Sequence, residues 1–334
     1  MNENKRLLYN LFSKIIKTVG YIVTAASVVF IARIVLSLNI DIVRIDHPVR
    51  AVIWIAGLIV LYCAFFSTLA YAWKLILQFV AGDEVPIPFV DIFPIYTRSN
   101  VYKYLPGNVM EFVGRNYLGV RLKLRHPQIA LSSLLEIILS LAVAMLIAFI
   151  FQYETFVRRV NPFIRKEVVS RYAIWIGIGS VICFLVIWYL IAKKSFSVSA
   201  SAFWSKRFLI MGAKTFFIYG VVFFSFGFSL VVIFTQVLGI PIALADFMTI
   251  NSIFALSWVV GFITPGSPGG LGVKEAVLLI LLAPMFGPDL TLLASVIHRV
   301  ISIFGDLILL LVGSLVGQGT SADISTSEGG SIQG

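Results

Sequence analysis

Four charged residues in apolar sequence near the C-terminal end of the chain are the best candidates for chemistry. Lys274 and Glu275 open one apolar run, and Arg299 and Asp306 lie seven residues apart in the next. Ionisable residues in lipid-compatible sequence are costly and usually face an interior cavity or one another. Arg299 is a natural partner for Glu275, or for a phosphate through its bidentate guanidinium. An ion pair that fixes helix packing and nothing more is the alternative.

Two helix-breaking clusters must position such residues, one in each half of the chain. Residues 105–108 read Leu-Pro-Gly-Asn, and residues 264–270 read Thr-Pro-Gly-Ser-Pro-Gly-Gly. Proline cannot donate to the helix ladder and glycine costs backbone entropy, so both clusters interrupt helices. Broken backbone at membrane depth is tolerated where it is buried in protein or lines a wet cavity. Matched breaks in two halves point to the binding site of a transporter.

The first break has two possible roles. Asn108 can cap the helix that follows, Glu111 can complete a capping box, and Glu111 and Arg115 have the four-residue spacing of an ion pair. Alternatively, the exposed N–H groups of this helix start, with Lys103 and Arg115 nearby, bind an anion such as a lipid phosphate. At the second break, the glycines leave room for a ligand or another helix to approach closely.

The composition predicts a polytopic membrane protein. Of the 334 residues, 59% are hydrophobic and 13% are charged, and the mean hydropathy is +0.98. The net charge of +10 is better explained by anionic lipid headgroups and topology control than by nucleic acid. No metal-ligand spacing, catalytic constellation or cofactor fingerprint is recognisable, so we predict no enzyme activity and no cofactor.

The elements expected from these patterns form an all-α bundle of about eight helices. A basic cytoplasmic segment (1–18) precedes a transmembrane domain (19–317) with halves at about 19–152 and 172–317, and a disordered polar tail (318–334) follows. The predicted spans are residues 19–38, 51–79, 132–151, 172–192, 208–238 and 290–316. Two irregular, re-entrant units lie between them, at 86–122 and 241–283.

The two irregular units are similar in sequence. Residues 86–95 align without a gap with residues 241–250, at an offset of 155, and both segments carry an Asp at the same place. Three predicted spans separate the units, so the second unit is inverted relative to the first, as in many secondary transporters. Segments on the N-terminal side of the membrane hold 14 Lys and Arg residues against 7 on the other side, which predicts cytoplasmic N- and C-termini in the cell membrane.

Two motifs resemble those of a known family. Residues 103–107 (Lys-Tyr-Leu-Pro-Gly) with Gly114-Arg115, and residues 268–276 (Pro-Gly-Gly-Leu-Gly-Val-Lys-Glu-Ala), look like the lysylphosphatidylglycerol synthase transmembrane-region family, and Arg299 fits the basic residue of its last span. The resemblance implies about eight membrane helices and flippase-like work on phospholipid or lipid-linked headgroups. A short polar tail follows the last span, so synthase activity is not expected. Lys274 stands where many relatives have Arg. Lysine keeps the positive charge but cannot donate the paired hydrogen bonds of a guanidinium.

We therefore predict a flippase-type transporter of an anionic phospholipid or lipid-linked sugar, with membrane lipid as its partner. The alternative is a non-transporting accessory protein that anchors a cell-envelope glycosyltransferase or lipid-modifying enzyme. The sequence does not identify the lipid, the direction or energy source of transport, or the oligomeric state. The predicted substrate-binding residues are Pro106, Gly107, Asn108, Glu111, Arg115, Pro268, Gly269, Gly270, Gly272, Lys274, Glu275 and Arg299.

Overall fold

The computed structural model describes residues 48–82, 86–105, 109–122, 124–160, 205–264 and 267–329. The predicted N-terminal segment (1–18), the predicted spans 19–38 and 172–192, and the site residues Pro106, Gly107 and Asn108 lie outside the described residues.

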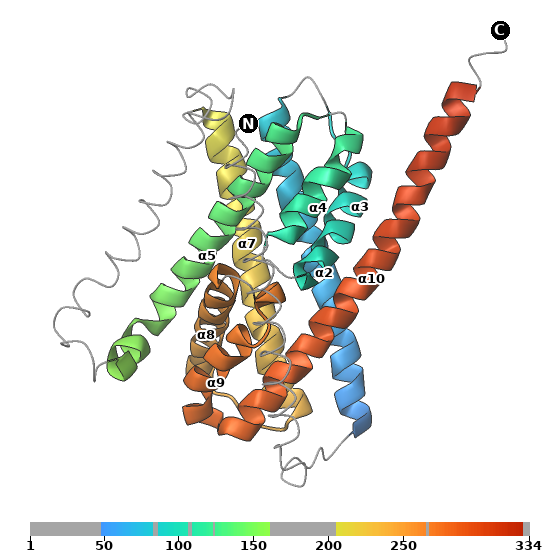
Figure 1. The fold of residues 1–334 in the computed structure, drawn as a ribbon. Coiled ribbons are helices and arrows are strands. Elements are labelled where there is room, and N and C mark those ends of the chain that lie inside the picture. The colour runs from blue at the N-terminus through green and yellow to red at the C-terminus, as the bar shows by residue number, and fades with distance from the viewer. Residues whose placement is uncertain are drawn as a thin grey trace, which may run out of the picture.

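The described part of the chain is helical and contains no strand (Figure 1). Its α-helices are α2 (Pro48–Ala81), α3 (Phe89–Asn100), α4 (Met110–Gly119), α5 (His126–Val160), α7 (Lys206–Val232), α8 (Leu244–Ile263), α9 (Val273–Phe286) and α10 (Pro288–Gly329). Short helical turns η2 (Val101–Tyr104), η3 (Val120–Leu122), η5 (Ile233–Val237) and η6 (Pro268–Gly270) connect or extend them. The predicted all-α fold is confirmed.

Five of the described helices are long and apolar enough to cross a membrane, which fits an integral membrane protein. Four of them, α2, α5, α7 and α10, cover the predicted spans 51–79, 132–151, 208–238 and 290–316. The fifth is α8, whose 20 residues are as long as a bilayer requires. The second irregular unit therefore has one arm of spanning length, where the sequence had predicted a re-entrant unit throughout.

Both irregular units fold as helical hairpins whose two arms pack together. Hairpin one is α3–η2–α4, and hairpin two is α8–η6–α9. Helices α3 and α8 begin at Phe89 and Leu244, 155 residues apart, as the sequence alignment of the two units requires. Each hairpin lies between two long helices in the chain, first α2 and α5, then α7 and α10. Figure 1 shows the two hairpins toward opposite ends of the bundle, as expected of inverted units.

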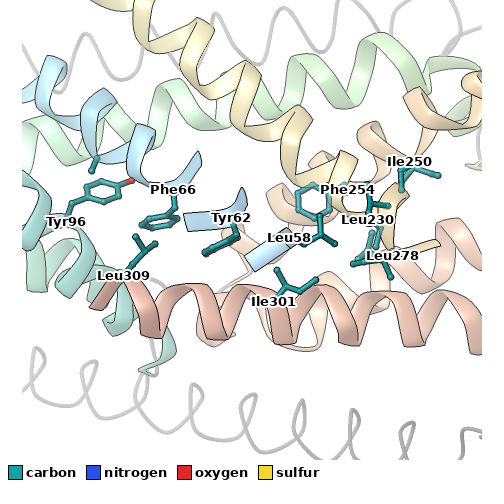
Figure 2. Packing of buried hydrophobic residues seen from close by; sticks show 14 of the residues in the cluster. Leu58, Tyr62, Phe66, Tyr96, Leu230, Ile250, Phe254, Leu278, Ile301 and Leu309 are labelled. Carbon is teal, nitrogen blue, oxygen red and sulfur yellow. The ribbon is translucent and has the colours of Figure 1, made fainter. Parts of the chain in front are cut away.

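Helix α2 packs against α3, α5, α7 and α10 in the described bundle. Its buried side chains Tyr62 and Phe66 face Ile301 and Leu309 of α10 and belong to the same core cluster as Phe254 of α8 (Figure 2). Burial of such side chains stabilises the contact between helices, and this shared core holds both hairpins against the long helices.

Helix α10 continues to Gly329, past the predicted end of the last span at residue 316. The sequence had led us to expect a disordered tail from residue 318. Extending a long helix fixes one residue for each added backbone hydrogen bond, whereas starting a helix is unfavourable. A polar segment can therefore remain helical when it continues an existing helix.

Candidate functional site

The two helix breaks meet in the middle of the bundle, at the contact between η2 and η6. A Cβ placed on Gly269 would lie 3.6 Å from Cγ of Lys103 and 4.0 Å from Cδ1 of Tyr104. The tips of the two hairpins, which are about 160 residues apart in the chain, therefore touch. This contact brings the charged residues of both halves into one region, as the matched breaks predicted.

The glycines of the second break are required by the backbone and by close packing. Gly269, Gly270 and Gly272 have positive φ angles of 55°, 73° and 78°, a conformation that favours glycine. A Cβ on Gly270 would lie 3.4 Å from Cα of Gly261 on α8. Of the two readings of these glycines, close approach by another helix is the one observed at Gly270.

An ion pair joins hairpin two to α10, as predicted. Nε of Arg299 lies 3.6 Å from Oε1 of Glu275, and Nη1 of Arg299 donates to the carbonyl oxygen of Gly269 at 3.2 Å. The other carboxylate oxygen of Glu275 accepts from the backbone N–H of Gly272 at 2.8 Å, which satisfies the start of α9. Nε and Nη2 of Arg299 are buried and make no hydrogen bond.

Lys274 points into the cavity formed at this junction. Its ammonium lies 4.1 Å from the ring centroid of Phe254, a cation–π distance. Within the described part of the chain, the ammonium has no hydrogen bond or ion pair. The predicted residues Lys274, Glu275 and Arg299 thus lie together rather than on separate surfaces.

Arg115 forms its ion pair with a different residue from the one predicted. Its guanidinium pairs with the carboxylate of Glu136 on α5, rather than with Glu111 on its own helix. Tyr96 donates a second hydrogen bond to Glu136 at 2.7 Å. Rings of Trp73, Tyr96 and Phe112 surround the guanidinium at 4.2–5.4 Å. Arg115 is therefore already paired with a carboxylate, and phosphate binding by Arg115 stays a prediction.

A second buried carboxylate, Asp306, ties hairpin one to α10. It is 1% exposed and accepts hydrogen bonds from side chains of α2, α3 and η2, at 2.5–2.8 Å, besides an ion pair with Lys103 at 2.7 Å. The three donors are Tyr62, Asn100 and Tyr104. The sequence indicated that Asp306 shares a helix face with Arg299, but it did not indicate these partners.

A cavity of about 190 Å³ lies between the two hairpins and helices α2, α5, α7 and α10. Its wall contains Lys103, Glu111, Arg115, Glu136 and Lys274, with Gly269 and Gly270 at the break. The volume is far above the 10–15 Å³ or so that one water requires, and the wall is polar enough to hold water. Aromatic residues complete the lining: Tyr62, Phe66, Tyr96, Phe112, Tyr219, Phe223, Phe226, Phe254, Trp258 and Phe262.

Glu136 and the aromatic residues of the cavity were weak or absent candidates in the sequence. Glu136 was set aside because it lies near the start of its span, and the aromatic lining was not recognised. In both hairpins, a charged residue of the second arm forms an ion pair with the long helix that follows. Arg115 of α4 pairs with Glu136 of α5, and Glu275 of α9 pairs with Arg299 of α10. That repeated pattern was readable in the sequence. Among the described residues, no group of His, Cys, Asp and Glu could hold a metal ion.

Comparison with protein-family models, with curated proteins and with solved structures gave no match. The geometry of the cavity is therefore what supports a function.

Proposed function

We propose that this protein is a flippase-type transporter that moves a phosphate-bearing lipid, a phospholipid or a lipid-linked sugar, between the leaflets of the membrane. The observation that carries the proposal is the buried cavity between two hairpins that enter from opposite ends of the bundle. Discontinuous helices of this kind place binding groups near the middle of a bilayer. The resemblance of the two motifs to flippase-like membrane proteins supports the same proposal.

The polar groups of the cavity suit a phosphate. In the cavity wall, Lys274 offers an ammonium without an ion-pair partner in the described residues. Arg299 is not itself in the wall, but it bonds the lining residue Gly269 and has two buried N–H groups, at Nε and Nη2, that lack hydrogen bonds. Leaving buried donors unsatisfied costs about 1–3 kcal/mol each. A phosphate oxygen would satisfy them with charge-assisted hydrogen bonds, which are about twice as strong as neutral ones.

The size of the cavity suits a headgroup rather than a whole lipid. Pockets that enclose complete small-molecule ligands measure about 300–1,000 Å³, and this cavity measures about 190 Å³. Acyl chains would therefore remain in the bilayer while the headgroup crosses inside the protein. The exposed apolar side chains on α10, such as Phe304, Leu307 and Leu311, can face those chains.

The test is leaflet-resolved lipid transport in liposomes that contain the purified protein. We expect Lys274→Gln and Arg299→Gln each to lower the transport rate by about tenfold or more, the effect of losing one hydrogen bond to a charged group. Arg121→Gln is the matched control, because Arg121 is an exposed cation outside the cavity. Equal rates for the two cavity variants and the wild type would refute the proposed site.

A further inference from the structure

We propose that the transported headgroup is zwitterionic, with its phosphate at Lys274 and its positively charged group at Glu111. This inference rests on the proposed function and specifies the substrate of the same cavity. It differs from the sequence-based expectation of an anionic lipid, because it places the phosphate at Lys274, and Arg115 is paired with Glu136.

The charges in and around the cavity sum to zero in the described part of the chain. Three ion pairs account for six of the eight charged side chains, and each pair joins a hairpin to a long helix: Lys103 with Asp306, Arg115 with Glu136, and Arg299 with Glu275. The remaining two are Lys274 and Glu111, both in the cavity wall. The cavity therefore offers no net positive charge to a net-anionic headgroup.

Lys274 and Glu111 do not neutralise each other. Neither has an ion pair or hydrogen bond within the described residues. They line the same cavity from different elements, because Lys274 lies over the ring of Phe254 on α8 and Glu111 belongs to α4. No ion pair joins the ammonium and the carboxylate, so the two lone charges are presented at separate places in one cavity wall.

A separated pair of opposite charges selects a ligand that carries both. A lone charge in a buried site is costly unless it is paired, and a zwitterion offsets that cost at both ends. A net-anionic headgroup without an amine would pair with Lys274 and leave Glu111 uncompensated beside it. Specificity then has two sources: a zwitterion pairs with both charges, and an anionic headgroup leaves the charge of Glu111 unpaired.

Arg299 determines which way round the headgroup binds, with its phosphate toward Lys274 and its ammonium toward Glu111. The buried Nε and Nη2 of Arg299 lack hydrogen bonds, and its Nη1 donates to the carbonyl oxygen of Gly269, which lines the cavity at the break just before Lys274. Donors therefore concentrate at the Lys274 end, which suits phosphate oxygens. The carboxylate of Glu111 is an acceptor and suits an ammonium group.

The experiment compares two acyl-labelled lipids in liposomes of one composition: phosphatidylethanolamine, which is zwitterionic, and phosphatidylglycerol, which is anionic and has no amine. We expect the wild type to move phosphatidylethanolamine at least about tenfold faster, the effect of one hydrogen bond to a charged group. Glu111→Gln should bring the two rates within about threefold of each other. Glu111→Asp, which keeps the charge, should retain the preference, and Arg121→Gln should change neither rate.

The outcomes separate this inference from the proposed function. Transport of both lipids at equal, Lys274-dependent rates would overturn the zwitterion inference and leave transport standing. If neither lipid moves, transport fails, and the inference is decided by native mass spectrometry of protein taken from bilayers with equal amounts of the two lipids. Retention of phosphatidylethanolamine that is lost in Glu111→Gln supports it, and retention without preference overturns it.

Discussion

The two hairpins are joined to neighbouring long helices by ion pairs of different quality. In hairpin one, the side chains of Arg115 and Glu136 are 3% and 8% exposed, and three aromatic rings enclose the guanidinium. In hairpin two, Arg299 is 15% exposed, and its Nε lies 3.6 Å from Glu275, which is too long for a good hydrogen bond. Arg115 leaves Nε without a hydrogen bond, whereas Arg299 leaves both Nε and Nη2.

The difference indicates which hairpin is fixed and which one is available to a ligand. Hairpin one is anchored twice, by Glu136 on α5 and by Asp306 on α10. The ion pair of hairpin two leaves spare donors on Arg299 of α10, and Lys274 in this hairpin has a lone ammonium in the cavity wall. A ligand gains most where donors are unsatisfied, so we expect substitutions in the ion pairs that hold hairpin one to affect stability, and substitutions of Lys274 in hairpin two to affect transport.

The largest effect on stability is expected from Glu136→Ala. It leaves the buried guanidinium of Arg115 without a carboxylate, which costs about 3–5 kcal/mol. Glu275→Ala should cost about 1–2 kcal/mol, because Arg299 keeps its bond to the carbonyl of Gly269. The measurement is the free energy of unfolding from denaturant titration in detergent. The double variant Arg115→Met/Glu136→Leu should lose less than Glu136→Ala; equal losses at Glu136 and Glu275 would contradict the comparison.

Asp306→Ala should lower the free energy of unfolding by about 2–4 kcal/mol. The change removes the shared acceptor of three side-chain hydrogen bonds and the partner of Lys103, so several buried donors lose their acceptor at once. Asp306→Asn keeps one acceptor oxygen and should lose less. The same denaturant titration checks both variants, and an effect of Asp306→Ala below that of Glu275→Ala would show that hairpin one is not the better anchored.

Gly305→Ala tests the anchor of hairpin one through packing. A Cβ at this position would lie 2.2 Å from Cδ1 of Tyr62, so the ring that bonds Asp306 must move, at a cost of about 1–3 kcal/mol. Gly212→Ala is the matched control in another long helix, because no atom lies within 4 Å of its Cβ. Alanine favours a helix over glycine by about 1 kcal/mol, so the control should be neutral or stabilising. A similar thermal unfolding midpoint for both variants would argue against this anchor.

The smallest change in stability is expected from Lys274→Met. Replacing a lone buried ammonium by an apolar side chain should leave the free energy of unfolding within about 1 kcal/mol of the wild type, or raise it. Transport of the labelled lipid should nevertheless fall by about tenfold or more. The two measurements are made on one preparation. A loss of stability above about 2 kcal/mol with normal transport would assign Lys274 to packing.

Much of the fold could be predicted because apolar length and helix breakers act locally. The runs that became α2, α5, α7 and α10 are long enough to span a membrane whatever their neighbours are. Pro86 and Pro241 marked the beginnings of the two irregular units, and α3 and α8 begin three residues after them, at Phe89 and Leu244. The length of α8 was missed because the sequence comparison with the shorter α3 suggested two equal units.

The candidate site was predicted in part. Glu275 and Arg299 were paired correctly because both are charges inside apolar runs and need a partner. Arg115 was misassigned because the four-residue rule favours Glu111, whereas the packing of α4 on α5 brings Glu136 to it. The hydrogen bonds to Asp306 come from three elements, and sequence spacing carries no information on such contacts.

Helix α10 holds both hairpin tips within two of its turns. Arg299 bonds the backbone of η6, and Asp306, seven residues later, bonds Lys103 and Tyr104 of η2. A rotation or axial shift of this stretch of α10 would therefore move both hairpin tips together. If the protein transports a lipid as proposed, access from the two sides of the membrane would be coupled through this single helix.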